Sequence, residues 1–326
     1  MAATNDDTRE NQRPEIYNEL ITDEEVLKFR RQIDDIEFKG LSFVQPYGYI
    51  FSERYIKYHN QFQNFQMFED DVFIATYPRC GTRWMQELVW RVRNDQEALS
   101  TEYLNVRVPM LDFCINFEED AHNFSPISNC DNLPRPRAFK THLAYDLLPK
   151  QFHQQKKGKA IFVIRNPRDI CQSLLNYFQN IENYTGDIQT IANIMTKDGI
   201  GLFYGPFFKV VLSYWNKRHD DNILIVFYEE MQKDLGSVIQ KVADFLNVSI
   251  TTDRVEHLVD FLSFNSMKDN KSSLFSSEFM SKSAARMYHK GRVGSWKDVF
   301  TPEMIQQFEE WENKHLKNTD LKFIYE

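Results

Sequence analysis

The sequence predicts an α/β fold in which helices flank a central parallel sheet. Strand-length apolar segments recur along the chain, and segments with helical spacing of apolar residues separate them. Alternation of this kind is typical of a parallel sheet covered by helices. The longest apolar runs, at 72–75, 160–164 and 223–227, fall far short of the roughly 18 residues that a membrane helix needs. We therefore expect neither a membrane span nor a membrane partner.

The first predicted helix follows a capping box formed by Thr22 and Glu25. A second helix starts at Thr82, shortly after the strand predicted over 71–76. The remaining elements in chain order are strands near Ala138 and over 160–164, a helix after Pro167, a strand over 222–227, and helices over 238–246 and 253–262. Because parallel sheets bind ligands beyond the carboxyl ends of their strands, the segments that follow the strands are the candidate sites.

Length and composition fit one large domain. With 326 residues, 42% of them hydrophobic, the chain can bury a sizeable core. We expect a single domain over residues 16–326, preceded by a disordered polar segment, residues 1–15. That segment is rich in acidic residues and has no apolar stretch, which disfavours a secretory signal or a transit peptide. A cytoplasmic location is the resulting expectation.

Charge and cysteine content disfavour several functions. The net charge of −8 does not suit a nucleic-acid binder, which needs a basic surface. The four cysteines lie far apart without CxxC spacing, so we expect neither a zinc site nor disulfides, and no metal. An anionic ligand must then meet local positive charge, which gathers at Arg79, Arg83, Lys140, Arg165, Arg168, Lys290, Arg292 and Lys297.

The segment after the first strand of the predicted sheet has the pattern of an anion site. Residues 77–84 read YPRCGTRW, a short loop with one glycine that leads directly into a helix. Backbone N–H groups at a helix start have no intrahelical partner and favour an anion. The loop lacks the second glycine and the Lys-Ser/Thr pair of a Walker A motif, which disfavours an ordinary nucleoside triphosphatase. Taken alone, the pattern also fits a plain strand-to-helix turn.

Two further segments strengthen the prediction. Lys140 and His142 follow one strand, and an imidazole is the side chain best suited to take a proton from a hydroxyl near neutral pH. Arg165 follows the next strand, and Ser173 lies two turns along the helix that begins at Pro167. An arginine and a serine in this arrangement can bind a phosphate.

These segments resemble the motifs of cytosolic sulfotransferases, including insect members of that family. The motifs occur in the family's order over roughly residues 40–315. Residues 77–84 are similar to YPKSGTTW, 140–142 to K[ST]H, 165–173 to RNxxDxxxS, 227–231 to FYEDM and 289–297 to RKGxxGDWK. The resemblance implies a single domain with a P-loop-like nucleotide-binding fold, and a metal-free transfer of a sulfuryl group from 3'-phosphoadenosine 5'-phosphosulfate (PAPS).

The resemblance also assigns roles to residues. It places the 5'-phosphosulfate of PAPS in the first loop, and makes His142 the base, with Lys140 and Arg79 stabilising charge at the sulfuryl group. The acceptor would be a small apolar molecule such as a phenol, a steroid or a retinoid. Aromatic residues that could line its pocket are Phe113, Phe117, Tyr177, Phe178, Phe203, Tyr204 and Phe207. The implied PAPS contacts are Arg79, Cys80, Gly81, Thr82, Arg83, Trp84, Arg165, Ser173, Tyr228, Ser263, Phe264, Met267, His289, Lys290 and Gly291.

Three positions depart from the family pattern. Arg79 replaces the catalytic lysine, and an arginine keeps the charge but cannot donate its proton. Arg83 replaces a threonine, and His289 replaces an arginine at the 3'-phosphate, so we expect PAPS affinity to fall as pH rises and His289 becomes neutral. The segment from Lys297 to Gln306 departs from the family's dimerisation motif, which predicts a monomer or a weak homodimer.

Four functions remain open from the sequence. The preferred one is an active sulfotransferase. The others are a relative that binds PAPS or its bisphosphate product without efficient turnover, a dehydratase that sulfates an alcohol and then eliminates the sulfate, and an adenylate-type kinase.

Overall fold

The computed structural model describes residues 15–33, 40–94, 103–116, 130–131, 133–269 and 291–326. His289 and Lys290 lie outside the described residues, as do residues 1–14, so the disorder predicted for the start of the chain stays a prediction. The division into one domain over residues 16–326 also stays a prediction.

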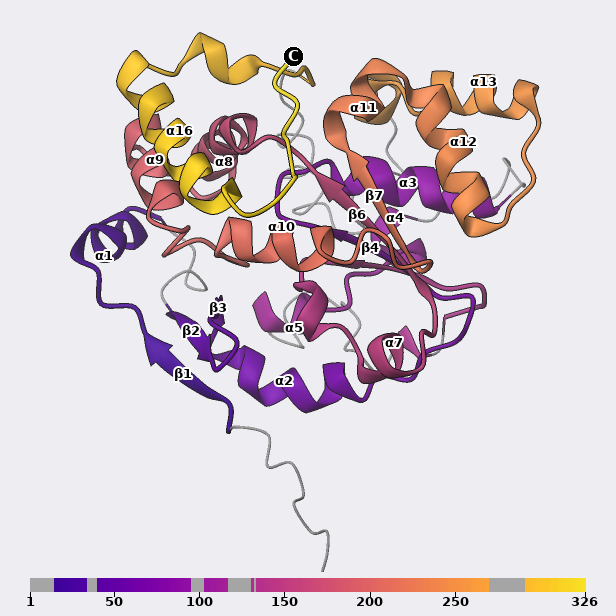
Figure 1. Cartoon of the computed structure of the whole chain (residues 1–326), viewed down its shortest axis with the longest axis horizontal. Coiled ribbons are helices and arrows are strands. Elements are labelled where there is room, and N and C mark those ends of the chain that lie inside the picture. The colour runs from indigo at the N-terminus through magenta and orange to yellow at the C-terminus, as the bar shows by residue number, and fades with distance from the viewer. Residues whose placement is uncertain (1–14, 34–39, 95–102, 117–129, 132, 270–290) are drawn as a thin grey trace, which may run out of the picture.

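A four-stranded parallel sheet with the order β5-β4-β6-β7 forms the centre of the fold (Figure 1). The predicted α/β fold with a central parallel sheet is therefore confirmed. The strands are β4 (Val72–Thr76), β5 (Ala138–Thr141), β6 (Lys159–Ile164) and β7 (Ile223–Phe227). Since all four run in the same direction, their carboxyl ends meet at one edge of the sheet.

Helices cover both faces of this sheet. The helices of the described residues are α1 (Glu24–Arg31), α2 (Arg54–Gln63), α3 (Thr82–Arg93), α4 (Leu104–Arg107), α5 (Phe113–Asn116), α7 (Lys150–Gln154), α8 (Pro167–Ile181), α9 (Ile188–Thr196), α10 (Phe207–Trp215), α11 (Tyr228–Lys233), α12 (Leu235–Leu246), α13 (Thr252–Phe261), α14 (Phe264–Asp269) and α16 (Pro302–Leu316), with 3-10 turns at Tyr145–Leu147 and Ser295–Asp298. Figure 1 places α3, α12 and α13 beside one another and α8, α9 and α16 in a second group.

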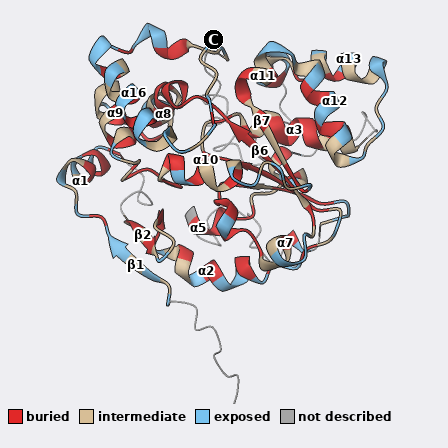
Figure 2. Cartoon of the chain, viewed as in Figure 1, coloured by how far each residue is buried: buried red, intermediate tan, exposed pale blue. Residues whose placement is uncertain are grey.

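The strands bury side chains on both faces, which explains their continuous apolar runs. In β4, Val72 and Ile74 belong to the apolar cluster under α3, α12 and α13, whereas Phe73 and Ala75 belong to the cluster that contains α8, α9 and α10. In Figure 2 the strands and the inward faces of these helices are buried, and the exposed residues lie on the outer surface. The sheet thus provides a largely buried support for the segments that follow its strands.

The helix starts at Thr82 and Pro167 are as predicted, α12 and α13 begin slightly earlier than predicted, at Leu235 and Thr252, and the cap of the first helix differs. Asn166 caps α8 by accepting the Asp169 N–H, and Pro167 takes the first helical position as predicted. The capping box predicted at Thr22 is wrong, because the carboxylate of Asp23 accepts the N–H groups of Glu25 and Val26 and α1 starts at Glu24. A carboxylate is the stronger cap beside the positive end of the helix.

The first strand of the parallel sheet is shorter than predicted. It begins at Val72 rather than at Asp71, and the carboxylate of Asp71 binds the buried guanidinium of Arg137 at 2.6 and 2.8 Å. This pair lies at the amino end of the sheet, opposite the candidate site. A buried ion pair with two hydrogen bonds fixes the end of the strand, because breaking it would leave an uncompensated buried charge.

A second sheet, which the sequence did not reveal, joins three antiparallel strands: β1 (Tyr17–Leu20), β2 (Leu41–Gln45) and β3 (Tyr49–Ser52). The backbone of Ile50 exchanges two hydrogen bonds with the segment after α9, because its N–H donates to the Gly205 carbonyl and its carbonyl accepts the Tyr204 N–H. The small sheet thereby holds Tyr204 against the main sheet. No described helix is long and apolar enough to cross a bilayer.

Candidate functional site

The loop after β4 forms a tight cradle at the start of α3. Gly81 is the N-cap of this helix and adopts a left-handed conformation with φ of +85°. A Cβ atom at this position would lie 2.7 Å from the ring of Tyr228. Only glycine therefore meets both the backbone and the packing requirement. The N–H groups of the first turn of α3 point out of the helix end, where they attract an anion.

His142 lies beside this loop in a defined orientation. Its Nδ1 is 2.7 Å from the carbonyl oxygen of Thr76 and 3.1 Å from the Thr76 hydroxyl, which in turn contacts the Thr82 hydroxyl at 2.7 Å. A carbonyl can only accept, so Nδ1 carries the hydrogen and Nε2 is the basic nitrogen. Burial, with help from the charge of Lys140, holds the pKa of His142 well below its usual value. The imidazole is therefore a neutral proton acceptor.

Asp112 orients the backbone at His142, and sequence reasoning missed it. Both carboxylate oxygens lie 3.3 Å from the His142 N–H, and the side chains of Tyr204 and Thr141 also hydrogen-bond the carboxylate. Burial raises the pKa of Asp112 despite these hydrogen bonds. The bridge between Met110 and Lys140 brings Asp112 to the end of β5. An isolated acidic residue in an irregular segment gives no sequence signal for such a position.

Lys140 places a cation near the imidazole, and Arg83 in turn lies near Lys140. Burial and the nearby charge of Arg83 lower the pKa of Lys140 to about 8, against a smaller opposing effect of Asp112. Lys140 and His142 lie on the same face of the chain at the end of β5, since side chains two residues apart in a strand point the same way. A bound anion would compensate the repulsion between these two cations and favour the charged form of Lys140.

Arg79, the residue in place of the family's lysine, connects the first loop with α8. Its Nε donates to the Ser173 hydroxyl at 3.0 Å, and its guanidinium lies 5.5 Å from the centre of the Tyr177 ring. The backbone of Arg79 has a φ of +72°, an uncommon conformation for this residue type. Arg165 donates to the Arg79 carbonyl at 3.0 Å, so the two arginines and the serine form one contiguous group.

Unsatisfied donors in this region fit an anionic nucleotide. Within the described part of the chain, Nε of Arg165 and Nε1 of Trp84 are buried and have no acceptor. Buried donors in native proteins are normally hydrogen-bonded, so a ligand that brings acceptors is expected here. The residues present therefore fit an adenosine bisphosphate carrier, with Arg165 at a phosphate and Trp84 at the edge of the base.

Two aromatic residues among the predicted PAPS contacts, Trp84 and Tyr228, lie together. The rings of Trp84 and Tyr228 meet edge to face at 5.8 Å, and the guanidinium of Arg165 lies 4.3 Å from the Tyr228 ring centre. Met267 is buried in the same apolar cluster. Gly291 lies so close to Phe264 that an added Cβ would be 2.3 Å from its ring.

Ser263 has a local structural partner. Its hydroxyl lies 2.9 Å from the Ser266 hydroxyl at the start of α14. The predicted contacts of Ser263 with PAPS stay predictions, as do those of His289 and Lys290.

Asp169 ties the segment after Gly291 to the start of α8. This buried carboxylate accepts N–H groups of Gly294 and Trp296 at 2.9 and 3.0 Å, the Ser295 hydroxyl at 3.0 Å and the Asn166 amide at 2.9 Å. The three bonds from Gly294, Ser295 and Trp296 hold the chain that carries Gly291 near the start of α8. Asp169 is thus a positioning residue for one side of the site.

Several positive residues singled out in the sequence serve structure instead. Arg168 is buried and pairs with Glu312 of α16 at 3.0 and 3.2 Å. Arg292 binds Asp298, and Lys297 binds Glu326 at 2.5 Å. Their charges are already compensated.

Cys80 is a buried part of the loop. Burial raises its pKa, so the thiol stays protonated rather than reactive. All four cysteines are described and buried, and no disulfide joins them. The described residues contain no group of three or more His, Cys, Asp or Glu residues that could hold a metal ion.

Comparison with known proteins identifies the class. The family described as the sulfotransferase domain matches residues 69–320. Luciferin sulfotransferase of Photinus pyralis is 32% identical over 289 residues, which cover 81% of this chain and 76% of the relative. Sulfotransferase 1B1 of Canis lupus familiaris is 31% identical over 296 residues, covering 87% and 96%. A crystal structure of retinol dehydratase in complex with retinol and PAP superposes with a TM-score of 0.81 at 26% identity, covering 95% and 99%.

The chain therefore belongs to the sulfotransferase family. As a member of this family the chain uses PAPS as its co-substrate, which confirms the family, the reaction class and the donor predicted from the sequence. Sulfotransferases bind small-molecule acceptors, so a small-molecule partner is confirmed as well.

Proposed function

We propose that this chain sulfates a hydroxyl group of a small apolar acceptor, with His142 as the general base. The observation that carries the proposal is the hydrogen bond from His142 Nδ1 to the Thr76 carbonyl, beside the glycine loop. This hydrogen bond fixes the tautomer in which Nε2 can take a proton. The imidazole lies beside the loop where an anion would bind. An amine is a second acceptor type that the same base could deprotonate.

The transfer is an in-line displacement at sulfur. Nε2 of His142 takes the acceptor's O–H proton, a bond forms from the acceptor oxygen to sulfur, and the bond from sulfur to the phosphate oxygen breaks. The products are the sulfate ester and adenosine 3',5'-bisphosphate. The negative charge that leaves with the phosphate oxygen must be stabilised by nearby cations.

Lys140, Arg79 and the amides around Gly81 supply this stabilisation. Lys140 is held near Arg83 and His142, and Arg79 is held by Ser173. Arg79 acts as a fixed cation and not as an acid, because a guanidinium keeps its proton even though burial lowers its pKa to about 10. Arg165 and Ser173, which both contact Arg79, would bind the 3'-phosphate of the donor.

The acceptor pocket is proposed from Tyr204, which contacts His142, and from further buried aromatic residues. Tyr204, whose ring lies 5.0 Å from the imidazole, is buried together with Phe178 and Phe207. Phe113 is also buried and lies on α5. These rings favour a flat apolar alcohol or phenol. Phe117, which the sequence also singled out, lies outside the described residues.

A panel assay tests the proposal. Purified protein is incubated with PAPS carrying ³⁵S and with phenols, steroids and retinols, and binding of adenosine 3',5'-bisphosphate is measured separately by thermal shift. We expect labelled sulfate esters and a bisphosphate-dependent rise in melting temperature. Bisphosphate binding without transfer would indicate the impaired relative. An anhydro product from an alcohol would indicate a dehydratase, the activity named for one structural relative.

We further propose that the protein acts in the cytoplasm as a monomer or weak homodimer, without nucleic-acid or membrane partners. Buried cysteines without disulfides fit a reducing compartment. In the segment that departs from the family's dimerisation motif, Lys297 is paired with Glu326, and Pro302 is the first residue of α16, after Thr301. Lys297 and Pro302 therefore both serve the local fold. Sedimentation velocity at micromolar concentrations distinguishes the monomer from a stable dimer.

A further inference from the structure

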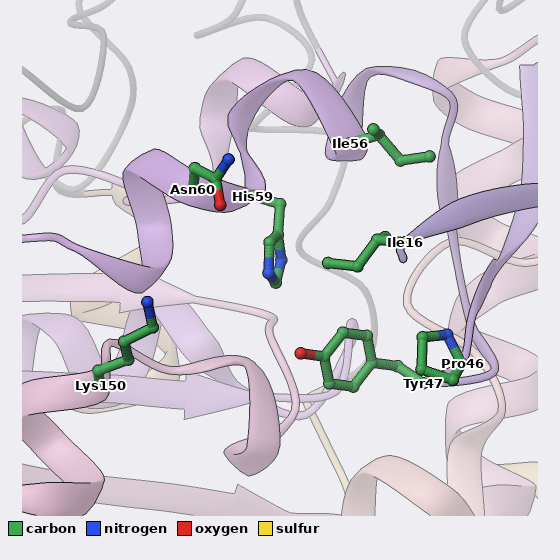
Figure 3. Close-up of a pocket in the computed structure, with 7 residues that line it drawn as sticks. All are labelled: Ile16, Pro46, Tyr47, Ile56, His59, Asn60 and Lys150. Carbon is green, nitrogen blue, oxygen red and sulfur yellow. The ribbon is translucent and has the colours of Figure 1, made fainter. Parts of the chain in front are cut away.

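A cavity lies away from the candidate active site. It has a volume of about 510 Å³ and is bounded by the chain before β1, the turn between β2 and β3, α2 and the start of α7 (Figure 3). The size falls within the range of small-molecule sites. The lining residues are Ile16, Pro46, Tyr47, Ile56, His59, Asn60 and Lys150.

Buried aromatic rings separate this cavity from His142. The contact path from His59 runs to Tyr55 with ring centres 5.5 Å apart, then to Phe51 at 4.5 Å, to Tyr204 at 5.6 Å and to His142 at 5.0 Å. Tyr55 and Phe51 are fully buried. The cavity is therefore distinct from the proposed acceptor pocket, which lies on the other side of these rings.

The walls combine apolar surface with positive charge. Ile16, Ile56 and Pro46 give one apolar side, and the ring of Tyr47 lies 5.8 Å from that of His59. The His59 ring projects into the space in Figure 3, and its Nδ1 is 3.0 Å from the Tyr55 hydroxyl, which fixes its orientation.

Lys150 supplies the positive charge. Its ammonium contacts the neutral amide oxygen of Asn64 at 3.3 Å, and no described carboxylate pairs with it. None of the seven lining residues is acidic, although the chain as a whole carries a net charge of −8. A ligand with a negative group would supply the missing counter-charge.

We propose that this cavity is a second small-molecule site, which binds an amphipathic anion with a flat apolar body and a sulfonate or carboxylate group. The body packs against Ile16, Ile56 and Tyr47, and the anionic group binds Lys150. The site is separate from the proposed catalytic group, since the two share no lining residue.

The probe is 8-anilinonaphthalene-1-sulfonate, titrated by fluorescence into protein saturated with adenosine 3',5'-bisphosphate and a phenolic acceptor. Lys150→Glu should weaken its binding at least about tenfold, because a charge-assisted contact is replaced by repulsion. Lys233→Glu on α11 makes the same charge change on a distant exposed side chain and should alter binding less than about twofold. The neutral relative N-phenyl-1-naphthylamine should bind at least about tenfold more weakly than the sulfonate.

Three outcomes would overturn the proposal. If Lys150→Glu and Lys233→Glu bind the sulfonate with equal affinity, the probe binds elsewhere. If the neutral compound binds as tightly as the sulfonate, the anionic group has no role in binding. If the probe no longer binds once the protein is saturated with adenosine 3',5'-bisphosphate and the acceptor, the probe binds in the active site. The bisphosphate-dependent rise in melting temperature, measured on each variant, shows that the fold is intact.

Discussion

The guanidinium Nε of Arg79 lies 3.0 Å from the hydroxyl oxygen of Ser173, which joins the loop after β4 to the second turn of α8. The family has a lysine at this position, and lysine carries a point charge rather than a planar fork. The contacts with Ser173 and with the Tyr177 ring show that the surroundings are shaped for a guanidinium.

Arg79→Lys should therefore lower kcat for sulfuryl transfer, by about tenfold or more, because a misplaced cation stabilises the transition state less well. Initial rates at saturating PAPS measure the effect. Lys157→Arg, a distant exchange between the same residue types, serves as the control. A higher kcat in the Arg79→Lys variant would contradict this prediction, because it would show that arginine slows sulfuryl transfer at this position.

The rate should depend on pH through Lys140. Its pKa is lowered to about 8, so it is charged below that pH and loses its positive charge above it. The pKa of His142 is well below its usual value, so the base stays neutral over the same range. We predict that kcat/KM for PAPS falls as pH rises through about 8. Lys140→Arg should move this fall in kcat/KM to higher pH. If the fall occurs at the same pH in that variant, it does not arise from Lys140.

Gly81→Ala should damage both stability and donor binding. The new Cβ would meet the Tyr228 ring, and alanine would have to adopt a left-handed backbone, which costs about 1–2 kcal/mol. Thermal melting with and without adenosine 3',5'-bisphosphate measures the two effects. Gly236→Ala in α12 is the matched control, since its Cβ meets only ordinary contacts at 3.7 Å, and it should melt at or above the wild-type temperature.

Asp169→Asn should weaken PAPS binding more than it slows turnover. An amide nitrogen would replace one of the two oxygens that together accept four hydrogen bonds, which costs about 2 kcal/mol of folding free energy and loosens the segment after Gly291. Steady-state kinetics should show KM for PAPS raised several-fold with kcat nearly constant. Asp244→Asn, on an exposed face of α12, should leave both unchanged. An equal fall in kcat would argue against a positioning role.

The sequence was sufficient to predict the parallel sheet and the loops at its carboxyl edge, because apolar strands and glycine turns leave local signals. Arg79, His142 and Arg165 were found in this way, and the structure brings them together. The small antiparallel sheet went unnoticed, since its strand β1 is mostly exposed and has no alternating apolar pattern.

Other features depend on contacts between segments far apart in the chain. The partner of His142 is a main-chain carbonyl at Thr76, which has no side-chain signature, and Asp112 reaches the site from an irregular segment. Arg168 looked like a ligand for an anion, but its partner Glu312 is 144 residues away. Pairing over such distances is set by the packing of α8 against α16 and cannot be inferred from local pattern.

The most direct test of the account is the transfer of ³⁵S-labelled sulfate by the His142→Gln variant. Glutamine can keep a hydrogen bond to the Thr76 carbonyl but cannot accept the acceptor's proton. We predict that the variant binds adenosine 3',5'-bisphosphate within about twofold of wild type and transfers sulfate at least about a hundredfold more slowly. Transfer at a rate close to wild type would show that another group takes the proton, and would contradict the central claim.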